Sequence, residues 1–318
     1  MRVVIALGGN AILKRGEVMS AENQRANVKR AALAINEVIK AGHEVITTHG
    51  NGPQVGLLAL QGLAYDANSA SPIDVLTAET EGMIGYMIEQ ELGNIITPEH
   101  EVATLLTQIE VDVGDSAFKN PTKPIGLLYD KKKAVALTAK YGWSMVPDGS
   151  HFRRSVPSPA PRRILEIGII QLLIKHGITV ICVGGGGIPV VKRNDGSFIG
   201  VEAVIDKDFA SALLAEEIKA DALLLLTDVD GVYLGWGTEQ QKQLRQITAD
   251  EIKTHTFATG SMAPKVQASL DFLDKGGKMA GIGKMEEALQ ILNGQAGTII
   301  VSGANWHSNV ALTQSHCS

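Results

Sequence analysis

Short apolar runs alternate with longer amphipathic segments along most of this chain. Runs that are apolar throughout are typical of strands buried on both faces, and helices between them indicate a parallel sheet. The sequence therefore predicts an α/β fold in which helices cover both faces of a mainly parallel sheet. The expected strands are 2–9, 44–48, 101–111, 178–183, 222–227, 278–282 and 297–301.

The segments between these strands repeat apolar residues at helical spacing. Ser20 is a suitable N-cap for the first of them, which ends at Gly42, and Thr248 and Glu251 have the spacing of a capping box. The other expected helices are 57–65, 74–92, 162–176, 207–219, 262–275 and 284–293.

Three segments depart from this alternation. Residues 114–160 are rich in Lys, Pro, Gly and aromatic residues, and we expect a protruding subdomain there, a candidate lid, within a single domain of residues 1–303. The Asn-Asp-Gly sequence within 190–204 is a hairpin signal. Residues 304–318 form a C-terminal tail without a pattern that predicts structure.

Composition narrows the function classes. A net charge of −5 over 318 residues argues against a nucleic-acid-binding surface. The apolar runs are shorter than the ~18 residues that span a bilayer, and Met1 is followed by a strand-like run rather than a signal peptide. Cys182 and Cys317 lie far apart, without the spacing of a zinc site or a disulfide framework. We therefore expect a soluble, cytoplasmic domain of the size of an enzyme that binds neither nucleic acid nor membranes.

Glycine-rich turns follow three of the expected strands. They are Gly8-Gly9-Asn10, the sequence His-Gly-Asn-Gly-Pro-Gln-Val-Gly at 49–56, and the four glycines of 184–187. The carboxyl ends of the strands of an open parallel sheet share one edge, where ligands bind. Turns without side chains let backbone N–H groups approach an anion. One such turn is most often only a tight turn, but three of them predict an anion site.

The glycine spacing disfavours a dinucleotide site. Gly50, Gly52 and Gly56 form G-x-G-x-x-x-G, which is one residue longer than the dinucleotide fingerprint and lacks the Gly-Lys-Ser/Thr ending of a P-loop. Asp74, the nearest acid for a ribose, opens an expected helix instead of ending a strand. A dehydrogenase is therefore a remote alternative.

Two lysines stand at expected helix starts, where the helix dipole disfavours a cation. Lys207 lies between Asp206 and Asp208, and Lys265 lies in the first turn of 262–275. The acids alone are explained equally well as helix caps. Two lysines in such positions predict a bound polyanion, such as a nucleoside triphosphate.

Asp228 and Asp230 follow the strand 222–227. They are typical of a plain turn, and they also suit a Mg²⁺-nucleotide or its ribose. Phosphoryl transfer uses glycine turns, lysines and Mg²⁺, because its transition state spreads negative charge over the transferring oxygens. An acceptor that is already an anion needs no general base. These residues together predict a small-molecule kinase.

Eight stretches, in one order, resemble the amino-acid kinase superfamily and, within it, the carbamate kinase family. The resemblance runs to about residue 301 and is most specific in 120–126, Asn-Pro-Thr-Lys-Pro-Ile-Gly, and in 200–211. The other stretches are 6–12, 49–56, 106–112, 184–190, 226–233 and 260–265. It implies a three-layer α/β/α sandwich and reversible, Mg²⁺-dependent phosphoryl transfer between ATP and carbamate, giving ADP and carbamoyl phosphate. It also implies a homodimer with a role in arginine catabolism.

The resemblance implies roles for individual residues as well. Catalysis is expected from Lys207 and Lys265, which would bridge the phosphates, from Lys123 above the site, and from Asp206 or Asp208, which would orient the lysines. The Mg²⁺ ligands remain unassigned. The acceptor and the phosphoryl group are expected on Gly8, Gly9, Asn10, Gly50, Asn51, Gly52, Gly185 and Gly186. The nucleotide is expected on Asp206, Thr227, Asp228, Tyr233, Met262 and Lys265.

One stretch departs from the family pattern. Residues 149–152, just before Arg153 and Arg154, read Gly-Ser-His-Phe in place of an Ala-Gly-Arg-Gly-like sequence. A kinase for another small carboxylate or phosphate acceptor therefore stays open as an alternative. A nucleotide-binding regulator without turnover is a further alternative, although the three retained lysines favour a catalyst.

Overall fold

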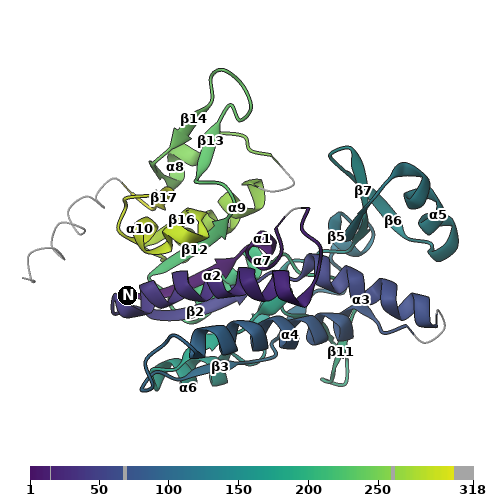
Figure 1. Ribbon diagram of the computed structural model, residues 1–318, viewed down its shortest axis with the longest axis horizontal. Coiled ribbons are helices and arrows are strands. Elements are labelled where there is room, and N and C mark those ends of the chain that lie inside the picture. The colour runs from purple at the N-terminus through teal and green to yellow at the C-terminus, as the bar shows by residue number, and fades with distance from the viewer. Residues whose placement is uncertain (15, 67–69, 259–261, 304–318) are drawn as a thin grey trace, which may run out of the picture.

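A mainly parallel sheet forms the centre of the computed structural model, which describes residues 1–14, 16–66, 70–258 and 262–303 (Figure 1). All of its neighbouring strands run parallel except the β16–β17 pair. The predicted α/β class with a mainly parallel sheet is therefore confirmed. In spatial order, the described strands of this sheet are β15 (Gln246–Thr248), β17 (Thr298–Val301), β16 (Met279–Lys284), β12 (Ala222–Thr227), β1 (Arg2–Leu7), β2 (Glu44–His49), β9 (Thr179–Ile181) and β3 (Val102–Thr104).

Helices cover both faces of the sheet, as the apolar strands require. Because successive side chains of a strand point to opposite faces, Val4 and Ala6 of β1 join one core and Val3 and Ile5 join the other. The first face is covered by α6 (Ile167–Lys175), α7 (Lys207–Glu217), α8 (Ala249–Ile252) and α9 (Met262–Asp274). The second is covered by α2 (Ala21–Lys40), α4 (Ile73–Gly93) and α10 (Ala288–Leu292). This is the three-layer sandwich that the resemblance implied.

A small antiparallel unit projects from one side of the sandwich (Figure 1). Its strands pair in the order β5 (Lys123–Tyr129), β7 (His151–Val156) and β6 (Ser144–Asp148), and α5 (Lys131–Tyr141) packs on them. It has a hydrophobic cluster of its own, which includes Tyr129, Leu137 and Trp143. We call residues 123–156 the protruding unit.

A second sheet lies beside the main one. It consists of β11 (Phe198–Gly200), β10 (Ile188–Lys192), β4 (Gln108–Val111) and β8 (Pro161–Ile164), in that order. The antiparallel β10–β11 pair confirms the hairpin predicted from Asn-Asp-Gly. The remaining elements are α1 (Gly9–Ile12), α3 (Gly52–Tyr65), the β13–β14 pair (Val232–Leu234 and Lys242–Leu244) and the 3₁₀ turns η1 (Ser116–Phe118), η2 (Gly184–Gly186) and η3 (Met285–Glu287).

The predicted strand 101–111 is wrong as a single strand. It divides into β3 in the main sheet and β4 in the second sheet. The backbone N–H of Thr107 leaves the strand ladder and donates to a carboxylate oxygen of Glu81, which lies on α4. Periodicity along one segment cannot reveal such a change of partner, because both pieces are equally apolar.

Two predicted helices begin later than expected. Residues 161–164 pair with β4, so the helix predicted at 162–176 starts only at Ile167. The segment predicted as a helix at 284–293 opens as the 3₁₀ turn η3 before α10. Conversely, the helix predicted at 57–65 begins at Gly52, with Pro53 in its first turn, where a missing N–H group costs nothing.

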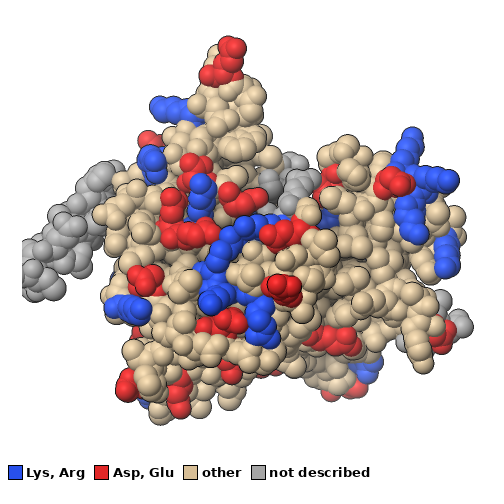
Figure 2. Space-filling view, in the orientation of Figure 1, with Lys and Arg blue, Asp and Glu red and all other residues tan. Residues whose placement is uncertain are grey.

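Surface charge is mixed in sign. Figure 2 shows acidic and basic side chains interspersed over one face of the molecule. Lys131, Lys132 and Lys133 open α5 on the protruding unit, where basic side chains gather in that view. Within the described residues, no helix is both long enough and apolar enough to cross a membrane.

Candidate active site

Four neighbouring parallel strands, β12, β1, β2 and β9, end at one edge of the sheet, and the glycine turns follow them there. A cavity of about 760 Å³ opens at this edge. The N-termini of α3, α7 and α9 border it, and these helix ends add backbone N–H groups and positive potential. Backbone N–H groups and positive potential therefore gather at this edge of the sheet.

The glycines let backbone segments approach each other closely. A Cβ at Gly8 would lie 2.9 Å from the carbonyl oxygen of Leu226, and one at Gly50 would lie 3.3 Å from the nitrogen of Gly9. Gly185 adopts a positive φ of 68° and packs on the side-chain amide of Asn51. Of the predicted acceptor residues, those that line the cavity are Gly8, Gly9, Gly50, Asn51, Gly52 and Gly185.

Two predicted acceptor residues stand apart. Gly186 does not line the cavity, because it packs against the backbone of Ile205, which itself lines the cavity wall. Asn10 lies in α1, and its side chain falls outside the described part of the structure. Ser261, which precedes α9 and is of a residue type that favours the N-cap, also lies outside the described residues.

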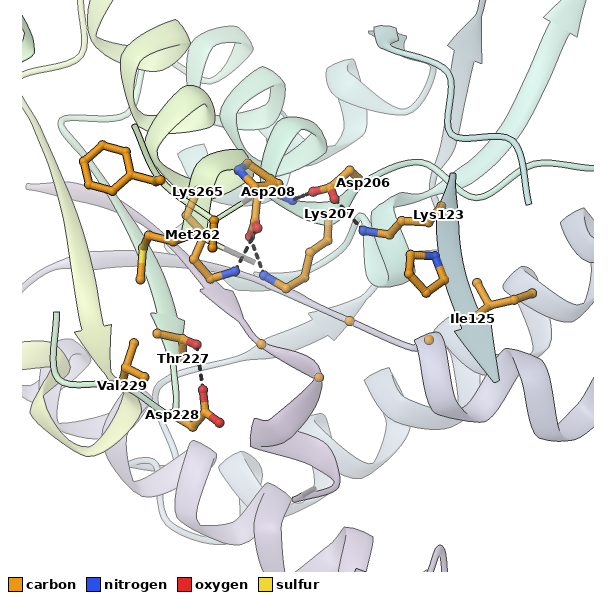
Figure 3. Close-up of a pocket in the computed structure, with 18 of the residues that line it drawn as sticks. Lys123, Ile125, Asp206, Lys207, Asp208, Thr227, Asp228, Val229, Met262 and Lys265 are labelled. Carbon is orange, nitrogen blue, oxygen red and sulfur yellow. Dashed lines mark hydrogen bonds and ion pairs between the residues drawn. The ribbon is translucent and has the colours of Figure 1, made fainter. Parts of the chain in front are cut away.

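Asp208 holds the two predicted lysines at the centre of the cavity (Figure 3). Its Oδ1 lies 2.5 Å from Nζ of Lys207, and its Oδ2 lies 2.9 Å from Nζ of Lys265. Figure 3 shows both ammonium groups turned toward each other beneath the start of α7. One carboxylate therefore fixes two cations that come from different helices.

Burial and neighbouring charges shift the pKa values of the residues in this cluster. It lowers the pKa of Lys207, and the carboxylate of Asp208 opposes this shift by favouring the ammonium form. Burial also disfavours the carboxylate of Asp208, but Lys207 and Lys265 outweigh it and hold the pKa of Asp208 well below its usual range. Two cations and one anion leave one net positive charge for a bound anion to neutralise.

The protruding unit contributes two cations to the cavity. Nζ of Lys123 forms an ion pair with Asp206, whose other oxygen caps α7 by accepting the N–H of Asp208 at 2.9 Å. Arg153 lines the same wall, and its Nε donates to the carbonyl oxygen of Gly126 at 3.1 Å. The sequence reasoning gave no role to Arg153, which follows directly after the stretch 149–152 that departs from the family pattern.

The departing stretch itself lies away from the cavity. Gly149 and Ser150 form the turn between β6 and β7, and Asp148 pairs with His151. None of the described residues 148–152 lines the cavity, whereas Arg153, which follows directly, does. The substitutions in this stretch therefore alter a hairpin turn rather than the cavity wall.

The opposite end of the cavity combines hydroxyl, carboxylate and aromatic side chains. The hydroxyl of Thr227 donates to Asp228 at 3.1 Å, while Asp230 accepts from the hydroxyl of Tyr233. Trp236 stands against Tyr233 with ring centroids 5.1 Å apart. Apolar side chains complete this end, and the sequence reasoning assigned none of them to the nucleotide: Val229, Trp236, Phe257 and Pro264. Trp236 and Phe257 lie outside the stretches that resemble the family, so no motif points to them.

Cation ligands are sparse at the site. Among the described residues, no group of three or more His, Cys, Asp or Glu side chains could hold a metal ion. Of the carboxylates that line the cavity, Asp206 pairs with Lys123 and Asp208 pairs with two lysines, whereas Asp228 lies beside Thr227 at the other end. Mg²⁺ bound together with a nucleotide needs only one or two carboxylates besides phosphate oxygens. The donor set therefore fits a cation that arrives with the nucleotide.

The comparison with known protein families agrees with this geometry. Residues 1–282 match the model of the amino acid kinase family. The chain belongs to the amino acid kinase family. A carbamate kinase of Rhizobium meliloti is 51% identical over 317 residues, covering 98% of each chain. The predicted family membership is thereby confirmed.

Two solved structures show the same fold. A carbamate kinase from Giardia lamblia bound to citric acid is 42% identical, with a TM-score of 0.89 over 94% of this chain and 98% of that one. The same Giardia enzyme bound to AMP-PNP is 41% identical, with a TM-score of 0.84 over 94% and 98%. These relatives share the whole sandwich with this member of the family, not only its core.

Proposed function

We propose that this amino acid kinase transfers a phosphoryl group reversibly between ATP and carbamate. The observation that carries the proposal is the Lys207–Asp208–Lys265 cluster, which faces the glycine turns across one cavity. The full-length similarity to carbamate kinases supports carbamate as the acceptor.

The chemistry follows from this arrangement. In the direction of ATP synthesis, an oxygen of the β-phosphate of ADP attacks the phosphorus of carbamoyl phosphate, and the bond from phosphorus to the carbamate oxygen breaks. Carbamate leaves as an anion, so no general base or acid is needed. Lys207 and Lys265 stabilise the charge on the transferring oxygens. Backbone N–H groups around Gly9, Gly50 and Gly52 hold the acceptor end.

Lys123 and Arg153 extend the cationic wall from the protruding unit. Lys123 reaches the cavity only while this unit packs against the start of α7, where it meets Asp206. We infer that the ammonium group of Lys123 contacts the phosphoryl group during its transfer. We also infer that Arg153 faces the acceptor end of the cavity, near Gly52. The nucleotide base would lie among the apolar and aromatic side chains, beside Tyr233 and Met262.

We propose that Mg²⁺ binds to the site together with the nucleotide. When bound, it would neutralise phosphate charge, and Asp228 would be the carboxylate that the protein offers to it. The chain's own part is to orient the phosphates through the lysines and the helix N-termini.

We propose a homodimer that pairs through the exposed face of α4. Val75, Met83 and Tyr86 lie along one side of this helix and are exposed, and Leu106 beside Gly82 is exposed as well. Apolar side chains clustered on one helix face are typical of an interface. Light scattering should give twice the mass of one chain, and Tyr86→Asp should reduce it to one chain; a monomeric wild type would contradict the proposal.

The test of the main proposal is ATP formation from ADP and carbamoyl phosphate in the presence of Mg²⁺. Turnover that depends on both substrates is expected. Absence of turnover at millimolar carbamoyl phosphate, with ADP binding intact by calorimetry, would overturn the carbamate assignment. A screen of small carboxylate and phosphate acceptors for ADP release would then test the alternative acceptor, and binding without any turnover would favour the regulator.

A further inference from the structure

Two consecutive residues of α4 hold two of the three glycine turns, those at 50–52 and 184–187. Thr80 accepts a hydrogen bond from the side-chain amide of Asn51 at 2.8 Å, and its hydroxyl donates to the carbonyl oxygen of Leu76 at 2.9 Å. Glu81 accepts the backbone N–H of Gly184 at 2.8 Å. Neither Thr80 nor Glu81 lines the cavity. They therefore contact the residues that form the acceptor end without reaching it themselves.

The contacts of Glu81 are unusual for a carboxyl group in a helix. The side chain is only 1% exposed, and its two oxygens accept the N–H groups of Gly184 and Thr107. Burying a carboxyl group is costly unless its oxygens are hydrogen-bonded. Here the cost is offset by hydrogen bonds from the backbone N–H groups of two loops that leave the main sheet. The side chain of Glu81 therefore fixes the positions of both loops.

The space around Gly184 shows how tightly this turn is held. A Cβ there would lie 2.5 Å from Nε2 of His49 and 2.7 Å from Cγ of Glu81. Val183, directly before Gly184, adopts a positive φ of 55°, which is unfavourable for a β-branched residue and needs surrounding contacts to hold it. Gly185 then packs on the amide of Asn51, which is the group held by Thr80.

We propose that Thr80 and Glu81 are positioning residues for the acceptor, fixing the turns at 50–52 and 184–187 at the spacing that one small anion requires. This inference rests on the proposed function. Loss of either hydrogen bond should weaken binding of carbamoyl phosphate and leave ADP binding unchanged, because ADP is expected at the other end of the cavity.

The chain offers matched controls on the same helix. Thr77 is buried and its hydroxyl has no hydrogen-bond partner, so Thr77→Val makes the same chemical change as Thr80→Val without removing a contact. Glu89→Gln matches Glu81→Gln at a half-buried position. Thr80→Ser keeps the hydroxyl group and should restore the behaviour of the wild type.

The experiment measures KM for carbamoyl phosphate and for ADP in all five variants. Thr80→Val and Glu81→Gln should raise KM for carbamoyl phosphate by about tenfold, the effect of one lost hydrogen bond, with KM for ADP within about twofold of the wild type. Equal rises in both KM values, or changes no larger than those of Thr77→Val and Glu89→Gln, would overturn the proposal.

Amide hydrogen exchange supplies a readout that needs no activity. Glu81→Gln should speed exchange in peptides covering 183–187, and Thr80→Val should speed it in peptides covering 49–56, while the control variants leave both unchanged. Unchanged exchange in the test variants would overturn the positioning role even if the wild type proved inactive. Inactivity of the wild type would count against the proposed function alone.

Discussion

Lys265 on α9 donates to Asp208 on α7 at 2.9 Å, across 57 residues of sequence. This contact joins two helices that cover the same face of the sheet and places their N-terminal ends at one cavity. Lys207, which precedes Asp208, takes the second carboxylate oxygen. The cation pair that phosphoryl transfer needs is therefore assembled by one buried acid.

Lys265→Ala should nearly abolish turnover. The variant lacks one of the two positioned cations that stabilise the negative charge of the transition state, so kcat should fall by roughly 10²–10³-fold. Circular dichroism should show an intact fold, because Lys207 still pairs with Asp208. Lys275→Ala, an exposed lysine just beyond α9, is the control and should keep its rate; similar rates for both variants would contradict the role of Lys265.

Asp208→Asn should destabilise the ligand-free protein more than the liganded one. Removing the buried acid leaves two lysines facing each other, at a cost of about 3–5 kcal/mol. A bound polyanion replaces the lost charge, so ADP with carbamoyl phosphate should raise the melting temperature of the variant more than that of the wild type. Thermal unfolding with and without ligands measures this. An equal ligand-induced rise in both proteins would refute the prediction.

Gly56→Ala should displace the protruding unit from α3. A Cβ at Gly56 would overlap the backbone of Gly126, which lies in β5 at a φ of 75°. Lys123 and Arg153 would move with that unit, so kcat should fall while the sandwich still folds. Gly93→Ala, at the end of α4 with open space around it, is the control and should be neutral or stabilising. Full activity in Gly56→Ala would show that the close contact is dispensable.

His49→Leu should reduce the decrease in the free energy of unfolding that occurs as the pH falls. Burial lowers the pKa of His49 from 6.5 to about 4. Between these values the unfolded chain binds the proton and the folded one does not, so stability falls as the pH drops from about 6.5 to about 4. The wild type should lose about 2 kcal/mol more than His49→Leu between pH 8 and pH 5. Urea unfolding at both pH values measures this difference, and identical losses would argue against a buried neutral histidine.

Local patterns were enough for much of this protein. Apolar runs such as 222–227 predict buried strands wherever both faces of the sheet are covered, because burying a polar side chain without a hydrogen-bond partner costs free energy. The glycine turns and the helix-start lysines predicted an anion site, since bare turns let backbone N–H groups approach an anion and a lysine at a helix start is unfavourable without one. The resemblance added the family, which the comparisons confirm.

Tertiary structure decided what local patterns do not carry. It divided 101–111 between two sheets, because the N–H of Thr107 found a carboxylate on α4 instead of a strand partner. Asp206 and Asp208 are equivalent in the sequence as acids at a helix start. In the structure, Asp206 pairs with Lys123, whereas Asp208 bridges Lys207 and Lys265. Tertiary structure also brought Thr80 and Glu81 beneath the acceptor turns. The sequence by itself determined which residues favour a buried strand, a helix end or an anion. Which partner each one meets depends on distances across the whole chain, and those are set only when the layers pack.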